Sequence, residues 1–149
     1  MNTASLTRVR LRSVRFVPFF LFHALRSSRQ TKSAPGCLGT ALRRFNGSFW
    51  TLTLWTDVAS MRAFMLSGAH RAAMPHLVNW CDEAATARFD WEGSTLPDWS
   101  IAEQHMATHG KLSPVKHPSP AQVAGLPLGT AGMVGVHFNE FSQPQPSAH

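Results

Sequence analysis

Cysteine is scarce in this 149-residue sequence, and several catalytic signatures are missing from it. Only Cys37 and Cys81 occur, and they form neither a CxxC pair nor a metal-ligand spacing. We therefore expect two reduced thiols in a cytoplasmic protein, with a disulfide as the alternative. No Gly-rich phosphate loop, supported nucleophile signature or paired-carboxylate motif is present, which sets kinase and hydrolase activities aside.

Long apolar runs are also missing. The apolar run near the N-terminus has seven residues, from Phe16 to Phe22, contains Pro18 and is followed by His23 and Arg26. A membrane-spanning helix needs about 20 apolar residues, so no membrane partner is expected. The basic N-terminus is also typical of a targeting segment, but no small-residue cleavage site follows it, so targeting stays the alternative.

Acidic residues are absent from the first 56 positions. Nine of the fourteen Lys and Arg residues precede Asp57, whereas all eight Asp and Glu residues lie at or beyond it. A solvated basic face is the simpler interpretation, and a positive face that docks on anionic partners is the alternative. No zinc-finger spacing or RNP-like motif accompanies the basic residues, so no nucleic-acid partner is expected.

Strand and helix signals alternate in the first half of the chain. Residues 8–12 alternate arginine with Val9 and Leu11, which is the period of a half-buried strand. A helix is expected over 18–32, where an apolar stripe follows Pro18 and cations lie near the end. The Asn46–Gly47 dipeptide favours a tight hairpin between strands over 37–44 and 48–55.

A second helix and strand follow the hairpin. Asp57 caps a helix that continues to Ser67, and a further helical segment spans 70–83, with Pro75 as a break or a new first turn. Residues 84–91 alternate as a fourth strand. The order β-α-β-β-α-β predicts an α+β, ferredoxin-like fold: an antiparallel sheet with helices on one face, for which a second copy is the usual cover.

The remainder of the chain differs in composition. A helix is expected over 97–109, whereas prolines and glycines from Gly110 onward indicate loop, with an edge strand at 135–138 and a disordered tail from Pro144. We therefore expect an α+β domain over residues 1–91. Residues 92–149 would form a helical and then irregular extension.

The stretch from Leu52 to His76 resembles the middle of the dimeric α+β barrel proteins. It contains Leu52-Thr53-Leu54-Trp55, a capped helix with Met61 and Phe64, and Ser67-Gly68-Ala69-His70-Arg71. The superfamily includes antibiotic-biosynthesis monooxygenases, haem-degrading monooxygenases and many small uncharacterised bacterial proteins. The resemblance implies a homodimer of ferredoxin-like subunits joined sheet to sheet, each with a pocket between its sheet and its helices.

The resemblance also implies roles for two histidines. In haem-degrading members a histidine after the second helix ligates iron, and His76 falls at that place. Cofactor-independent members instead need a base in an apolar pocket, which deprotonates an electron-rich aromatic substrate. His70 and His76 are the candidate catalytic residues, because imidazole exchanges protons near neutral pH. No cofactor is required under this hypothesis, and haem would bind only through His76.

The expected pocket suits a small apolar or aromatic ligand. Its candidate lining residues are Phe49, Trp50, Trp55, Phe64, His23 and Arg10. Packing in the core or at a dimer interface explains the aromatic residues as well. Arg10 and Arg12 ordinarily face solvent, or bind an anionic ligand if they face the interior. His105 and His109 share a helical face, but only Glu103 could complete a ligand set, so no metal is expected.

The sequence thus predicts a cytoplasmic homodimer with monooxygenase-like, oxidoreductase activity, cofactor-independent or haem-associated. The alternative is a non-catalytic homodimer, either ligand-binding or structural, in which both histidines are incidental. Oxygen uptake with quinol-type substrates separates the two hypotheses.

Overall fold

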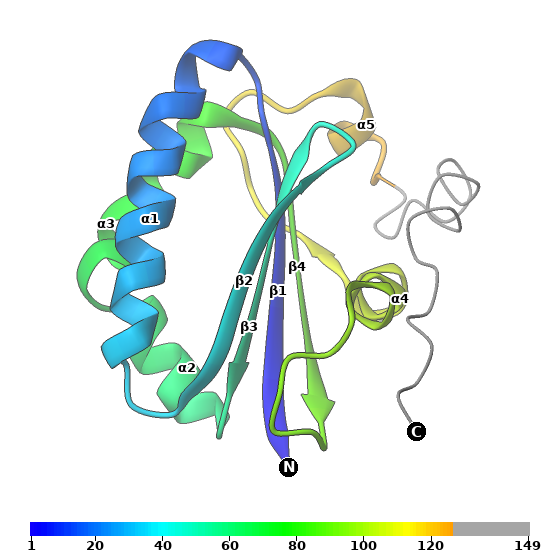
Figure 1. Ribbon diagram of the computed structural model, residues 1–149. Helices are drawn as coiled ribbons and strands as arrows, with labels where there is room; N and C mark the ends of the chain where they lie inside the picture. Colours follow the sequence, from blue (N-terminus) through cyan, green and yellow to red (C-terminus); the bar gives the residue numbers. More distant parts are fainter. Residues whose placement is uncertain (127–149) are drawn as a thin grey trace.

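The computed structural model describes residues 1–126, which form a five-stranded antiparallel sheet with helices on either side (Figure 1). The strands are β1 (Asn2–Leu11), β2 (Cys37–Phe45), β3 (Ser48–Trp55), β4 (Cys81–Trp91) and β5 (Lys111–Leu112). They lie in the order β2-β3-β1-β4-β5, so the first strand is central. The first four strands and their connecting helices have the ferredoxin-like arrangement that the sequence predicts.

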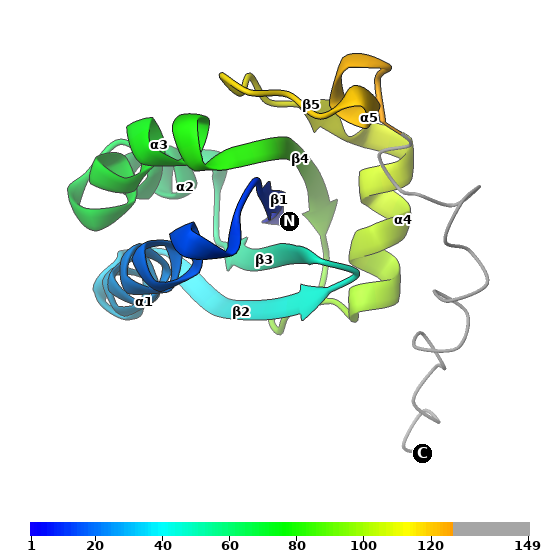
Figure 2. The ribbon, with the colours of Figure 1, turned by 90° about the horizontal axis from the view of Figure 1, so that it is seen from above.

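Three helices cover one face of the sheet. After a short 3-10 turn, η1 (Val14–Phe16), these are α1 (Val17–Ser33), α2 (Val58–Met65) and α3 (Gly68–Trp80) (Figure 2). We call them the helix layer. Two further helices follow β4, namely α4 (Trp99–His109) and α5 (Pro120–Val123). The helices predicted over 18–32 and 97–109 are confirmed, whereas the helix over 70–83 ends earlier, at Trp80.

Local sequence explains several of these boundaries. The Oδ1 atom of Asp57 accepts a hydrogen bond from the backbone N–H of Ser60 at 2.7 Å, which caps α2. Asn46 and Gly47 have φ angles of 52° and 74°, as a two-residue hairpin of this kind requires. The predicted hairpin between β2 and β3 is therefore confirmed. Pro75 lies inside α3 and does not break it.

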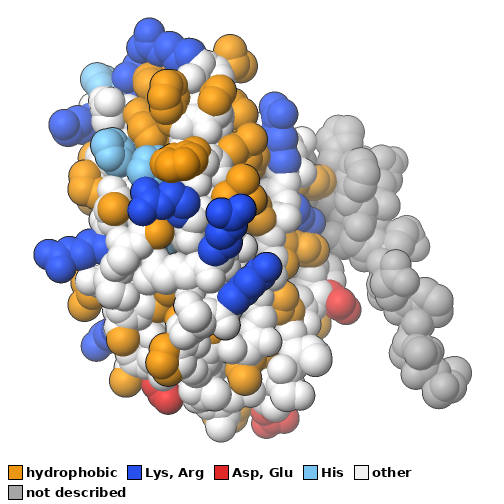
Figure 3. Space-filling model, turned by 60° about the vertical axis from the view of Figure 1, so that its left-hand side comes forward, with side chains coloured by type: hydrophobic (Ala, Val, Ile, Leu, Met, Phe, Trp, Pro, Cys, Tyr) orange, Lys and Arg blue, Asp and Glu red, His pale blue; other side chains and the backbone are white. Residues whose placement is uncertain are grey.

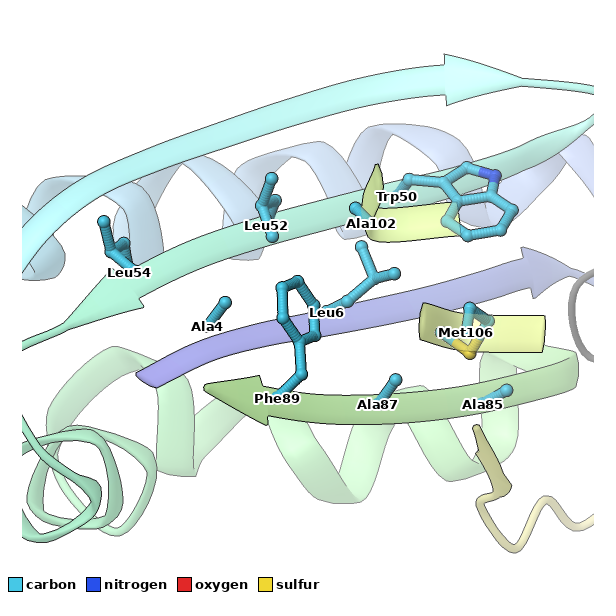
Figure 4. Close-up of a cluster of buried hydrophobic side chains, with 10 residues drawn as sticks. All are labelled: Ala4, Leu6, Trp50, Leu52, Leu54, Ala85, Ala87, Phe89, Ala102 and Met106. Carbon is cyan, nitrogen blue, oxygen red and sulfur yellow. The ribbon is translucent and has the colours of Figure 1, made fainter. Parts of the chain in front are cut away.

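The face of the sheet opposite the helix layer is covered by α4 of the same chain (Figures 1 and 2). The sequence predicted helices on one face only, with a second copy as the cover. The structure differs because α4 brings Ala102 and Met106, both fully buried, onto the strands. The strand residues of this cluster are Ala4, Leu6, Trp50, Leu52, Leu54, Ala85, Ala87 and Phe89 (Figure 4).

Arg43 of β2 attaches α4 to the sheet. Its guanidinium forms an ion pair with Glu103 of α4 and lies 4.4 Å from the ring centroid of Trp99 and 5.5 Å from that of Trp50. Both contacts are within the range of cation–π interactions. Burial lowers the pKa of Arg43 to about 10, so the side chain stays charged at neutral pH. The pair therefore orients α4 across the strands.

Arg8 and Arg10 of β1 are paired with acids of β4, and Arg10, which was expected to face solvent, is partly exposed. Arg8 is buried, with Nη2 3.2 Å from a carboxylate oxygen of Glu83. Arg10 donates two hydrogen bonds, of 2.9 and 2.8 Å, to the carboxylate of Asp82. Ser119, which precedes α5, donates to Glu83 at 2.9 Å. This polar cluster holds α5 against β4.

Some expectations lie outside the described residues, namely the edge strand at 135–138 and the disordered tail from Pro144. The division of the chain after residue 91 stays a prediction. Within residues 1–126, no helix combines the length and the apolar character needed to cross a bilayer. Cys37 and Cys81 are both free thiols, and burial raises the pKa of Cys81 to about 12.

Candidate functional site

A cavity of about 690 Å³ lies between the sheet and the helix layer. Cavities that bind small molecules usually have volumes of roughly 300–1,000 Å³, so this one has the size of a ligand site. The helix-facing sides of β1 to β4 form its floor, and side chains from the three helices form its roof. The end of α4 and the start of β5 contribute to one side.

Hydroxyl side chains dominate the floor of the cavity. Strand pairing places them in two rows across the sheet. One row runs Thr40, Thr53, Ser5 and Arg88, and the other runs Leu42, Thr51, Thr7 and Thr86. The hydroxyl residues in these rows are at least partly accessible. The floor can therefore donate and accept hydrogen bonds over much of its area.

The roof of the cavity is more apolar than its floor. Phe64 and Met61 of α2 lie beside Trp55, whose ring centroid is 5.1 Å from that of Phe64. Met65, Ala73, Met74 and Leu77 extend this surface along the helices. Apolar and aromatic lining with a few polar groups is typical of small-molecule sites, and here α2 and α3 supply most of the apolar groups of the roof, while α1 adds Ser27, Ser28 and Thr31.

His70 lies in the first turn of α3 and lines the cavity. Its Nδ1 atom is 3.1 Å from the backbone oxygen of Met65, and its ring centroid is 4.9 Å from that of Phe64. Because a carbonyl oxygen only accepts, the contact favours the tautomer that carries its proton on Nδ1. In this tautomer Nε2 keeps its lone pair and can accept a proton.

Gln30 of α1 holds the turn that carries His70. Its Oε1 atom accepts a hydrogen bond from the backbone N–H of His70 at 2.9 Å, and its Nε2 donates to the backbone oxygen of Ser67 at 2.9 Å. Gln30→Met should therefore lower the free energy of unfolding by about 1–2 kcal/mol, since it removes both hydrogen bonds. Urea unfolding measures the change, and Gln104→Met on exposed α4 surface is the control. An equal, small effect in both variants would contradict this role for Gln30.

Burial lowers the pKa of His70 below its usual value of 6.5, and the hydrogen bond with Met65 opposes this only in part. The imidazole is therefore neutral at neutral pH. In the unfolded chain the same group gains a proton near pH 6.5, so acid favours unfolding. Burial also lowers the pKa of His23 and of His105, which act in the same direction.

The free energy of unfolding should consequently decrease as the pH falls from about 7.5 to about 5. His70→Asn should show a smaller decrease than the wild type, because it lacks one of the titrating groups. Urea unfolding of both proteins at the two ends of this range measures the difference. An identical acid-induced loss in both would show that His70 is not held neutral by the fold.

His23 of α1 and His76 of α3 lie side by side in the helix layer. Their ring centroids are 5.2 Å apart, and His76 stacks on Trp80 at 5.0 Å. His23 lines the cavity, and its Nδ1 atom is buried without a hydrogen-bond partner among residues 1–126. His76 is exposed and does not line the cavity. Of the two histidines proposed as catalytic, the structure thus places only His70 in the cavity wall.

Of the other predicted pocket residues, some line the cavity and some do not. Trp55 and Phe64 line the cavity. Phe49 is on the same face of β3 but packs against Phe20, with ring centroids 4.6 Å apart, outside the cavity lining. Trp50 points to the opposite face, toward α4, because neighbouring residues of a strand alternate. Arg10 is paired with Asp82 and lies outside the cavity lining.

Solved structures share this architecture, whereas no family model and no curated protein matches the chain. SnoaB, a cofactor-independent oxygenase from Streptomyces nogalater, is 17% identical with a TM-score of 0.53, over 65% of this chain and 98% of that one. A structure described as an antibiotic biosynthesis monooxygenase is 14% identical with a TM-score of 0.55, over 61% and 99%. The chain shares the ferredoxin-like α+β fold of these structures.

Structures with this fold are not all described as oxygenases. A conserved protein from Methanosarcina mazei Go1 is 14% identical with a TM-score of 0.56, over 62% of this chain and 94% of that one. At these identities the similarity establishes the fold.

Haem was expected only with His76 as its iron ligand. That residue is stacked on Trp80 outside the cavity, so it does not fit as a ligand for haem held beneath the helix layer. Within residues 1–126, no three His, Cys, Asp or Glu side chains are grouped closely enough to hold a metal ion.

Sequence reasoning missed the hydroxyl rows and Gln30. The alternation of Ser5, Thr7, Thr51 and Thr53 with leucine and arginine is visible in the sequence, but it equally suits a solvated strand face. Only the register of four strands shows that these residues form one surface. The contact of Gln30 with α3 joins residues 40 positions apart and leaves no local signal.

Proposed function

We propose that the chain is a cofactor-independent, monooxygenase-like oxidoreductase that binds a small hydroxylated aromatic ligand in the cavity. The observation that carries the proposal is the placement of His70. A neutral imidazole, oriented by a backbone carbonyl, lies in the wall of a ligand-sized cavity beside Phe64. A general base of this kind is what an oxygenase without a cofactor requires of its protein.

Different residues of the cavity would bind the ring, bind its oxygen atoms and accept a proton. Phe64, which packs on buried Trp55, would contact the ring together with the more exposed Met65 and Met74, while the hydroxyl rows of the floor would bind its oxygen substituents. Nε2 of His70 takes the proton of a ligand hydroxyl, and the resulting oxyanion makes the ring a better reductant. Molecular oxygen then accepts electrons from the ring. One oxygen atom enters the ring as a carbonyl and the other leaves as water.

Oxygen uptake with 1-naphthol tests the proposal. The balanced reaction takes one 1-naphthol and one O2 to one 1,4-naphthoquinone and one water. With ¹⁸O₂, the quinone should carry one labelled atom, and uptake should exceed that with heat-denatured protein. Hydrogen peroxide without label in the product, or no uptake, would contradict the proposal. Binding of 1-naphthol without uptake would favour the non-catalytic ligand-binding alternative.

The homodimer expected from the sequence stays a prediction. Because α4 covers the second face of the sheet, a second copy would contact α4 and not a bare sheet. Light scattering of the purified chain determines the number of copies. Cytoplasmic location likewise remains a prediction.

A further inference from the structure

The first helix exposes its apolar side chains. Phe19, Phe22 and Leu25 of α1 are 57%, 57% and 58% exposed. The residues of α1 that line the cavity are Phe20, His23, Ala24, Ser27, Ser28 and Thr31. An amphipathic helix of a globular protein normally turns its apolar stripe toward the core. Here aromatic and leucine side chains lie on the outward side, while serine and threonine line the interior.

Arginines share this outward stripe. Arg26 and Arg29 follow Phe19 and Phe22 at helical spacing, so all four lie on one side of α1. Both arginines are exposed, and the guanidinium of Arg26 lies 5.5 Å from the ring centroid of Phe22. Long arginine side chains can rest on an apolar surface while their charged ends reach beyond it. The stripe therefore combines apolar and cationic groups over the same area.

The whole helix layer carries charge of one sign. Residues 14–33 and 58–80 contain no Asp or Glu, and all of their Lys and Arg side chains are exposed. These are Arg15, Arg26, Arg29, Lys32, Arg62 and Arg71. In Figure 3, which shows this side of the molecule, blue and orange side chains are interspersed and the red ones lie in the lower part. The layer thus attracts anions along α1 and α3, while the exposed Asp57 carboxylate lies at the start of α2.

We propose that the helix layer docks on an anionic lipid surface, with α1 lying along it. Phe19, Phe22 and Leu25 would enter the boundary between headgroups and acyl chains, and the arginines would contact lipid phosphates. The sequence led us to expect no membrane partner because no segment is long enough to cross a bilayer. A helix that lies on the surface needs no such segment.

Charge and chemistry favour lipid over other occupants. A second copy bound through the same layer would bring its cations against these cations, which is unfavourable. The phosphates of a nucleic acid could pair with the cations. Exposed Phe22 and Leu25, however, are not part of a known nucleic-acid-binding motif. An anionic bilayer offers phosphate groups and an apolar interior within a few ångströms, which matches the mixed stripe.

Vesicle sedimentation tests the proposal. The full chain should sediment with vesicles of phosphatidylcholine mixed with phosphatidylglycerol, and not with vesicles of phosphatidylcholine alone. Added salt should weaken the binding, because it screens the exposed charges. Sedimentation with neither kind of vesicle, or equally with both, would overturn the proposal.

Two variants of α1 separate the apolar and the cationic contributions. Phe19→Ser/Phe22→Ser should lower the partition coefficient roughly tenfold or more. Arg26→Gln/Arg29→Gln should lower it about 25-fold, which corresponds to about fivefold for each arginine. The matched controls are Leu112→Ser/Val123→Ser and Lys111→Gln/Lys116→Gln. They remove exposed apolar and cationic side chains outside the helix layer and should bind as the wild type does.

The remaining outcomes also decide the question. Circular dichroism should show wild-type thermal unfolding for every variant, because the replaced side chains are exposed. Equal loss of binding in the α1 variants and in their controls would overturn the proposal. So would a wild-type dimer in light scattering that becomes a monomer in Phe19→Ser/Phe22→Ser, since that result would assign the stripe to a second copy.

Discussion

His70→Ala is expected to lower the turnover rate for oxygen uptake with 1-naphthol by roughly 10²- to 10⁴-fold, which is the usual contribution of a general base. The KM for 1-naphthol should change little, because the floor and the aromatic wall that bind the ring remain. His76→Ala is the matched control, since this exposed histidine lies outside the cavity lining. Equal losses in the two variants would remove His70 from the mechanism.

The pH dependence of turnover provides a second readout of the same residue. A base must be deprotonated to act, and burial lowers the pKa of His70 below 6.5. The wild-type rate should therefore rise with pH up to a value below 6.5 and then level off. If the same rise with pH persists in the residual activity of His70→Ala, the titration of another residue causes it.

Met106→Ala is expected to lower the free energy of unfolding by about 2–5 kcal/mol, the range measured for large-to-small changes in protein cores. Met106 is fully buried where α4 meets the sheet, so its removal leaves a cavity at that contact. Urea unfolding measures the loss, and Gln104→Ala on the exposed side of α4 is the control. A loss no larger than that of the control would show that α4 does not cover the sheet in solution.

Local signals predicted the elements of the fold well. Residues 48–55 form β3 as expected, and the helix cap at Asp57 and the turn at Asn46–Gly47 lie where short-range chemistry places them. These features depend on a few neighbouring residues. The predicted order of elements was then sufficient to indicate the ferredoxin-like arrangement.

Long-range contacts could not be predicted in the same way. The helix over 97–109 was expected, but nothing in its own residues shows that it lies across the sheet, because Arg43 and Glu103 are 60 positions apart. Arg8 pairs with Glu83 across an even longer separation of 75 positions. For the site, the alternation along β3 already separates Trp50 from Trp55, so the two could not both face one cavity.

The two hydroxyl rows would affect which ligands the cavity binds. A hydrocarbon such as naphthalene would displace water from Thr7 and Thr51 but could not form hydrogen bonds with their hydroxyl groups. Phenols and quinones compensate for that desolvation. A site that hydrogen-bonds a substrate hydroxyl discriminates strongly against analogues that lack this hydroxyl. Apolar pockets discriminate only weakly between rings of similar size. Selectivity would therefore depend more on the number and position of the oxygen atoms of the ligand than on its carbon skeleton.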